Sequence, residues 1–228
     1  MTLKRVWICA LLICTGATTL RAQTDPKAKV ILDAVSKKYR SFSAIKSDFS
    51  YQLDNPQEKN KSYSQSGTII ANPKTNQFRL TLYNSLGSQK TLDQEIISDG
   101  KTQWTYSKRE NEVQINDADN NPESLNPAQV FTIYEKGYKY LFAGTVKQQG
   151  SIYQQIDLTP VDSNKPFYKI KLLINKAKNL IYSASIYDKN GSHYTYILNS
   201  AATNYTGSAA VFGFNKKNYP GVEVVDLR

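Results

Sequence analysis

The segment Phe78-Arg79-Leu80-Thr81-Leu82-Tyr83 alternates between apolar and polar side chains. Successive side chains of a β-strand point to opposite faces, so this alternation predicts a half-buried strand with Phe78, Leu80 and Leu82 on its apolar face. The same period of two recurs in segments such as Tyr168–Ile174 and Leu180–Tyr187. A sheet with one apolar and one polar face is typical of antiparallel architecture.

Turn signals separate many of the alternating segments. Asp99-Gly100 and Asn190-Gly191 predict tight hairpins, because both dipeptides suit backbone with positive φ. Consecutive hairpins predict a mainly β protein built on a single curved antiparallel sheet, curled into a barrel or half-closed barrel. The expected strands are Ser47–Leu53, Tyr63–Ala71, Phe78–Tyr83, Gln89–Ser98, Gln103–Ser107, Glu112–Asn116, Thr145–Gln149, Ile152–Thr159, Tyr168–Ile174, Leu180–Tyr187, His193–Asn199 and Val211–Phe214.

Two segments do not follow the strand period. Apolar residues of Pro26–Tyr39 recur at steps of three and four, and Asp25 precedes the proline as a helix N-cap would, so we expect an N-terminal helix. Asn121–Gly144 predicts a loop with one or two short helices inserted in the sheet. We expect the helix and this central helical lid to cover the curled sheet, although the pattern leaves open whether they enclose a filled core or a cavity.

Residues 1–22 have the pattern of a secretory signal peptide. Lys4-Arg5 precede an uncharged run, Val6–Leu20, and Ala22 suits the residue before the cut. Cleavage there leaves a single domain, residues 23–228, and removes Cys9 and Cys14. Lipidation at either cysteine is the alternative, but an isoleucine precedes each of them where such sites need a small residue. We therefore expect an exported, soluble protein without thiol chemistry.

The composition favours binding over catalysis. The chain has 29 Lys+Arg against 19 Asp+Glu, and the scattered lysines indicate a solvated surface and no nucleic-acid partner. The single histidine, His193, follows a hairpin turn and is interpreted as a surface residue. Asp93 and Glu95 are expected on one strand face and could form the carboxylate pair of an exported hydrolase, the enzyme alternative. We expect no catalytic residue, metal or cofactor.

Several segments together resemble one family. They are Ser47–Phe49, Gly67–Ile69, Phe78–Leu80, Ile97–Tyr106 and Pro220–Arg228, in that order along the chain. They are similar to the LolA family, periplasmic carriers of outer-membrane lipoproteins, and the Asn/Lys/Tyr-rich surface resembles Bacteroidetes members. The resemblance implies a half-closed barrel with a helical lid over a hydrophobic cavity. It also implies a monomer that binds lipoprotein acyl chains, receives them from an inner-membrane ABC transporter and delivers them to an outer-membrane acceptor.

The resemblance also implies which residues line the cavity. The matching positions are Phe49, Phe78, Leu80, Trp104 and Tyr106 on the sheet, with Val130, Phe131 and Ile133 on the lid. The family usually has an arginine before the proline of the turn that precedes the Phe78 strand, whereas this chain has Asn72-Pro73, and Arg79 is expected to point away from Phe78. This departure implies either that lid closure is controlled differently or that the protein is a paralogue with another cargo. Two alternatives to the lipoprotein carrier stay open: a carrier of a glycolipid or another lipid, and a scaffold or sensor that binds proteins on the same fold.

Overall fold

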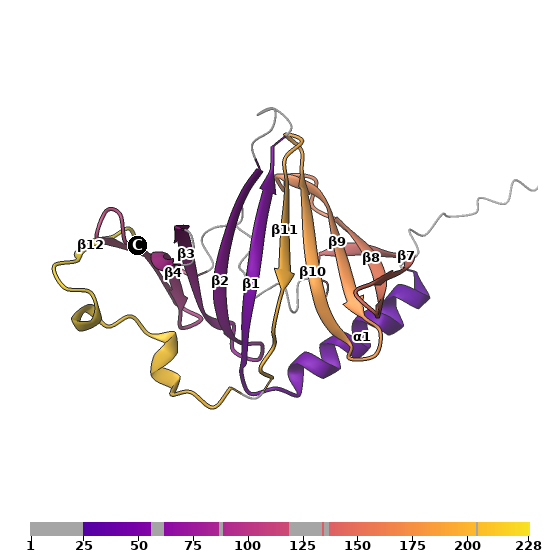
Figure 1. Cartoon of the computed structure of the whole chain (residues 1–228), viewed down its shortest axis with the longest axis horizontal. Coiled ribbons are helices and arrows are strands. Elements are labelled where there is room, and N and C mark those ends of the chain that lie inside the picture. Colours follow the sequence, from indigo (N-terminus) through magenta and orange to yellow (C-terminus); the bar gives the residue numbers. More distant parts are fainter. Residues whose placement is uncertain (1–24, 56–61, 87–88, 119–133, 135–136, 204) are drawn as a thin grey trace, which may run out of the picture.

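A single long sheet forms the body of the protein (Figure 1). The computed structural model describes residues 25–55, 62–86, 89–118, 134, 137–203 and 205–228. The elements are α1 (Pro26–Arg40), β1 (Ile45–Asp54), β2 (Ser62–Asn72), β3 (Gln77–Leu86), β4 (Gln89–Ser98), β5 (Thr102–Ser107), β6 (Glu112–Asp117), β7 (Tyr138–Gln148), β8 (Ser151–Pro160), β9 (Phe167–Asn175), β10 (Leu180–Asp188), β11 (His193–Leu198), the 3₁₀ helices η3 (Ala209–Phe212) and η4 (Lys216–Asn218), and β12 (Glu223–Asp226).

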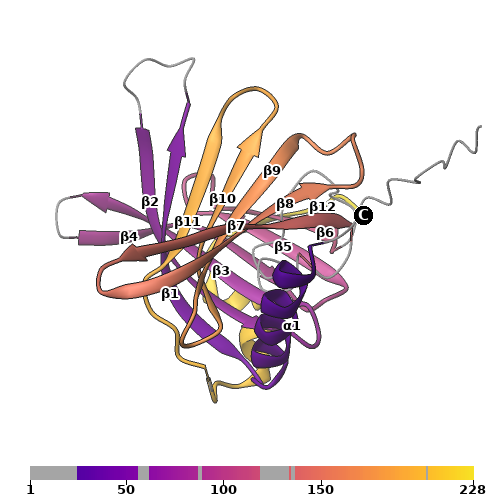
Figure 2. The same ribbon diagram turned by 90° about the vertical axis from the view of Figure 1, so that its right-hand side faces the viewer.

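The strand order is β12-β6-β5-β4-β3-β2-β1-β11-β10-β9-β8-β7. Neighbouring strands are antiparallel except that β12 joins β6 in parallel. Pairing of β1 with β11 brings two strands that are far apart in the sequence together in the middle of the sheet. Figure 2 shows the sheet curling around the side on which α1 lies. The predicted mainly β, curved and open antiparallel sheet is therefore confirmed.

Helix α1 begins where the sequence predicts, and its cap also ties it to the sheet. One carboxylate oxygen of Asp25 accepts a hydrogen bond from the Lys27 amide at 2.8 Å, and the other accepts one from the Phe142 amide of β7 at 2.9 Å. These backbone N–H groups, that of Phe142 foremost, lower the pKa of Asp25 because they stabilise its charged form. The cap thus fixes the helix start against the edge strand β7.

The buried stripe of α1 packs on one face of the sheet, which we call the α1 face. Its residues and those of the sheet form one apolar cluster, whose fully buried members include Phe78 of β3 and Leu172 of β9. The stripe itself consists of Ala28, Ile31, Leu32, Val35 and Tyr39. Tyr134, from the central segment, is also buried in this cluster. Residues of both halves of the sheet therefore share one core.

Tyr39 connects the end of α1 to β10 through a buried hydrogen bond. Its hydroxyl oxygen accepts from the Ile181 amide at 3.0 Å, and burial raises the pKa of the phenol. Replacing Tyr39 with phenylalanine is expected to lower the free energy of unfolding by about 1–3 kcal/mol, because the Ile181 N–H would be left buried without this acceptor. Urea unfolding measures the loss. Tyr168→Phe is the control, because Tyr168 is half exposed, and an unchanged midpoint for Tyr39→Phe would contradict the prediction.

Three expectations for secondary structure are wrong. Residues 138–144 belong to β7 and not to a helical insert, since Tyr138, Tyr140 and Phe142 alternate before a bulge between Phe142 and Gly144. The segment expected as strand Val211–Phe214 contains no strand, since its first two residues belong to η3, and β12 was not expected as a strand. Apart from Tyr134 and Gly137, the remainder of the predicted lid, including Val130, Phe131 and Ile133, lies outside the described residues, as does the predicted signal peptide.

Candidate functional site

The floor of the α1 face contains three of the residues that the family resemblance selects. Phe49, Phe78 and Leu80 come from β1 and β3, belong to the apolar cluster, and are 3%, 0% and 5% exposed. They lie together because β2 lies between β1 and β3 and holds them in register through Gly67 and Ile69. Their burial makes them the base of the site and not its accessible surface.

The accessible part of the α1 face lies next to this floor. It includes partly buried side chains that pack against the cluster: Tyr51, Leu82, Ile96, Tyr194, Tyr196 and Leu198. The sequence signal for them was the continued alternation beyond Phe49 and Leu80, since Tyr51 and Leu82 are two positions further along the same strands. The resemblance alone did not select them. A ligand that reaches the α1 face from solvent meets these residues first.

Gly67 lets the Phe49 ring lie close to the backbone of β2. It pairs with Phe49 on one side and Leu82 on the other. A Cβ added at Gly67 would come within 2.6 Å of the Thr81 carbonyl oxygen and would clash with the Phe49 ring. The absence of a side chain therefore allows Phe49 to lie over β2, where it extends the apolar floor towards β3.

A row of polar side chains crosses the α1 face beyond the apolar floor. The carboxylate of Asp93 accepts one hydrogen bond from the Gln65 amide group and one from that of Asn84, each at 2.8 Å. Asp93 turns to this face because β4 has a bulge at this position. Leu82 pairs with Gln94 and Tyr83 pairs with Leu92, so the pairing with β3 skips Asp93. Glu95 remains on the opposite face, so the expected carboxylate pair on one face is wrong.

Tyrosine rings continue this row across β1 and β11. The Tyr51 ring lies 5.0 Å from that of Tyr196 and stacks on that of Tyr194 at 6.1 Å between centroids. Burial raises the pKa of Tyr196 to about 12 and also raises that of Tyr51, so both phenols are neutral hydrogen-bond donors at pH 7. Tyr194 bonds to the Asp188 carboxylate, and partial burial raises the pKa of Asp188.

Trp104 and Tyr106 lie on the other side of the sheet, which corrects the expectation that they line the same cavity as Phe78. In the β4–β5 pairing Trp104 is opposite Ile97 and Tyr106 is opposite Glu95, and β3 pairs these with Arg79 and Thr81. Tyr106 instead forms a second apolar cluster with Val113, Tyr219 and Val222, against which Trp104 packs. We call this side the strap face.

The strap face is named for the C-terminal strap, residues 205–222, which follows the outside of the sheet from β1 to β5. The Tyr205 amide donates to the Ala44 carbonyl at 3.1 Å near the start of β1. Further along, the Tyr219 ring packs on that of Tyr106 at 4.6 Å between centroids. Figure 1 shows α1 and the strap under different halves of the sheet. The strap ends by placing β12 beside β6.

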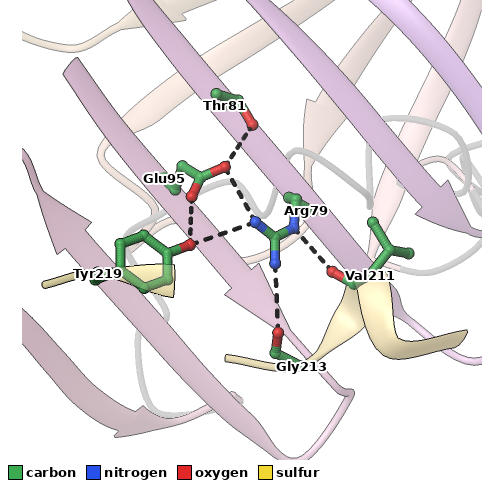
Figure 3. A network of polar contacts seen from close by, with 6 residues as sticks. All are labelled: Arg79, Thr81, Glu95, Val211, Gly213 and Tyr219. Carbon is green, nitrogen blue, oxygen red and sulfur yellow. Dashed lines mark hydrogen bonds and ion pairs between the residues drawn. The ribbon is translucent and has the colours of Figure 1, made fainter. Parts of the chain in front are cut away.

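A buried polar network anchors the strap (Figure 3). The Arg79 guanidinium donates to the Val211 carbonyl at 2.8 Å, to the Gly213 carbonyl at 3.3 Å and to Glu95 at 3.1 Å. Glu95 also accepts from the Tyr219 hydroxyl at 2.5 Å and from Thr81 at 3.0 Å. Burial is the main cause that raises the pKa of Tyr219 to about 12. As expected, Arg79 points away from Phe78.

Beside this network is a polar hollow of about 300 Å³, bordered by Arg79, Leu92, Glu95, Tyr106, Lys108, Asn111, Asn218, Tyr219 and Pro220. Two of its charged groups, Arg79 and Glu95, are already engaged in holding the strap. His193 lies elsewhere, paired with Asp54 at 2.9 Å and stacked on Tyr187. Within the described ranges, no three His, Cys, Asp or Glu side chains are grouped as metal ligands, and no helix is long and apolar enough to span a membrane.

Comparisons with known proteins agree with this architecture. A family model described as outer membrane lipoprotein carrier protein LolA matches residues 40–215. An uncharacterized conserved protein from Thermus thermophilus is similar in structure, with a TM-score of 0.57 at 14% identity over 88% of this chain and 99% of that chain. At this identity the likeness shows the fold.

Two further solved structures are more distant. A LolA superfamily protein from Nitrosomonas europaea has a TM-score of 0.45 at 11% identity, over 82% of this chain and 97% of that one. LprF from Mycobacterium bovis has a TM-score of 0.48 at 12% identity, over 82% of this chain and 99% of that one. No curated protein matches the chain.

Proposed function

The chain belongs to the LolA family, and on that premise we propose that it carries lipoproteins through the periplasm by binding their acyl chains on the α1 face. The observation that supports this most is the set of partly exposed apolar side chains, among them Leu82 and Leu198, that lies over a buried apolar floor. The cargo would come from an inner-membrane ABC transporter and go to an outer-membrane acceptor. The protein would act as a monomeric binding protein and not as an enzyme.

The energetics of acyl chains favour partial burial on an open face. Each CH₂ removed from water contributes roughly 0.8 kcal/mol, so complete burial of two long chains would make release very slow. The α1 face offers apolar surface that is already half covered by its neighbours, so a bound chain would gain part of that free energy. Loading can then be driven by the transporter, and release can proceed to an acceptor with a larger apolar surface.

Leu82→Glu tests the proposal. We expect the variant to bind a fluorescent fatty-acyl probe at least about tenfold more weakly and to lose co-purifying lipoproteins, because a carboxylate would be placed on acyl-binding surface. Leu141→Glu is the control, since Leu141 of β7 is 59% exposed and pairs with Asp157, away from the cluster. Equal loading of both variants would contradict the proposal.

Mass spectrometry of whatever co-purifies separates the alternatives. A glycolipid or another lipid in place of lipoproteins would indicate a different cargo for the same site. A stable stoichiometric protein complex without extractable lipid would indicate a scaffold.

A further inference from the structure

The polar row described above gives the α1 face two chemically different zones. Leu82, Ile96 and Leu198 form the apolar zone above the buried floor. The row begins one cross-strand pair beyond this zone. Tyr196 is opposite Tyr51, and Tyr51 is opposite Gln65, which bonds to Asp93. The row therefore runs without a break from β11 to β4. An acyl chain on the apolar zone would place its head group against this row.

The charge of the row is negative. Asp93 and Asp188 both contribute carboxylates, and in the part of the chain that the structure describes neither forms an ion pair with a lysine or arginine. The strand cations nearby lie on the other face: Arg79 is held by Glu95, and Lys169 lies over the Tyr187 ring. On the α1 side, Lys27 lies over the Phe142 ring of β7, at the other end of the sheet.

The row has acceptor capacity that its own residues do not use. Each oxygen of Asp93 accepts one hydrogen bond from a neighbouring amide, whereas a carboxylate has about four acceptor sites. The carboxylate of Asp188 is hydrogen-bonded to Tyr194 and is partly desolvated. A second hydrogen-bond donor from a ligand would therefore stabilise its charge. A ligand that brings N–H or O–H groups would find acceptors here. Among the described residues of the row, a ligand that brings a phosphate would meet the carboxylates of Asp93 and Asp188 and no lysine or arginine.

We propose that this polar row selects lipids whose heads carry N–H donors and no negative charge, as in the lipid-modified cysteine at the start of a lipoprotein, and that it rejects anionic phospholipids. The inference rests on the proposed carrier function and adds a rule for its specificity. Such a rule matters for a carrier of acyl chains, because phospholipids and lipoproteins bring similar chains and differ in their heads. Discrimination must therefore come from contacts outside the apolar zone.

Three lipids with identical palmitoyl chains test the proposal: a dipalmitoyl-glyceryl cysteinyl peptide with uncharged side chains, dipalmitoyl phosphatidylglycerol, and glucosyl dipalmitoylglycerol. Competition against a fluorescent acyl probe gives their relative affinities. We expect the lipopeptide to bind at least about tenfold more tightly than phosphatidylglycerol, with a ratio that falls as salt is added. The double variant Asp93→Asn/Asp188→Asn should bring the ratio to within about threefold. Asp188→Asn alone, which leaves the hydrogen bonds of Asp93 intact, should reduce it in part.

Asp157→Asn is the matched control, because Asp157 of β8 pairs with Lys171 in the sheet and faces away from the apolar cluster. It should leave the ratio unchanged. Equal affinities of the wild-type protein for the lipopeptide and phosphatidylglycerol would overturn the specificity rule while the carrier function stands. Tighter binding of the glucosyl lipid than of the lipopeptide would overturn the assignment of the head group. Binding of none of the three lipids would overturn the carrier function itself and the rule with it.

Discussion

Replacement of Arg79 with alanine is expected to lower the free energy of unfolding by about 3–5 kcal/mol. Arg79 holds a buried ion pair with Glu95, and their side chains are 18% and 11% exposed. Without the guanidinium, Glu95 would keep a buried charge without its cation, and the carbonyls of Val211 and Gly213 would lose their donor. The strap would lose one of its main attachments to the sheet at the same time.

Two measurements check this expectation. Urea unfolding gives the loss of stability, and limited proteolysis should cut the strap of Arg79→Ala faster than that of the wild type. Arg109→Ala is the control, because Arg109 forms an exposed pair with Glu110 and its loss should cost less than about 1 kcal/mol. Replacing Arg79 and Glu95 together with methionine and leucine should restore much of the stability, since no charge then remains buried. Equal behaviour of the two arginine variants would contradict the network's role.

The sequence predicted the orientation of Arg79 but not its partners. Alternation in residues 78–83 places Arg79 opposite to Phe78, and this holds in the structure. Its acceptors, Val211 and Gly213, are more than 130 residues away along the chain, in a segment that was expected to be a strand. Local patterning carries no information on such pairings, because any strand face that is covered by a distant segment has the same alternation as one that faces the core.

The same limit explains why the sequence did not predict the face of the sheet on which Trp104 and Tyr106 lie. Their spacing predicts that they share a face, and they do, but a pattern with period two does not say which face. The strap covers the face on which they lie, so aromatic residues suit it as well as they suit the α1 face. Pairing with β4 decides the side, and the bulge at Asp93 changes the phase within β4 itself. Bulges have a weak sequence signal, which is also why β7 was partly missed at Gly144.

What the sequence did predict well is the set of elements with strong local signals. The N-cap Asp25 and the apolar stripe that follows it placed α1 within one residue at its end. The Asp99-Gly100 turn lies between β4 and β5, with Gly100 at a φ of 91°. For the site, the resemblance selected the buried floor, whereas the accessible residues and the polar row depend on which strands are neighbours. The floor and the accessible surface must therefore be tested separately.

Replacing Phe78 with alanine tests the floor. Phe78 is 0% exposed, so we expect the free energy of unfolding to fall by about 3–5 kcal/mol, from the lost transfer energy and the void left behind. Ile97→Ala is the control, since Ile97 is equally buried on the strap face and should lose about 2–5 kcal/mol. The two voids should differ in their response to lipid, because the void at Phe78 adjoins the apolar zone of the α1 face. A palmitoyl probe should then raise the urea midpoint of Phe78→Ala by more than it raises that of the wild type, and should not do so for Ile97→Ala. A loss below about 1 kcal/mol for Phe78→Ala would mean that the ring is not packed into a filled floor.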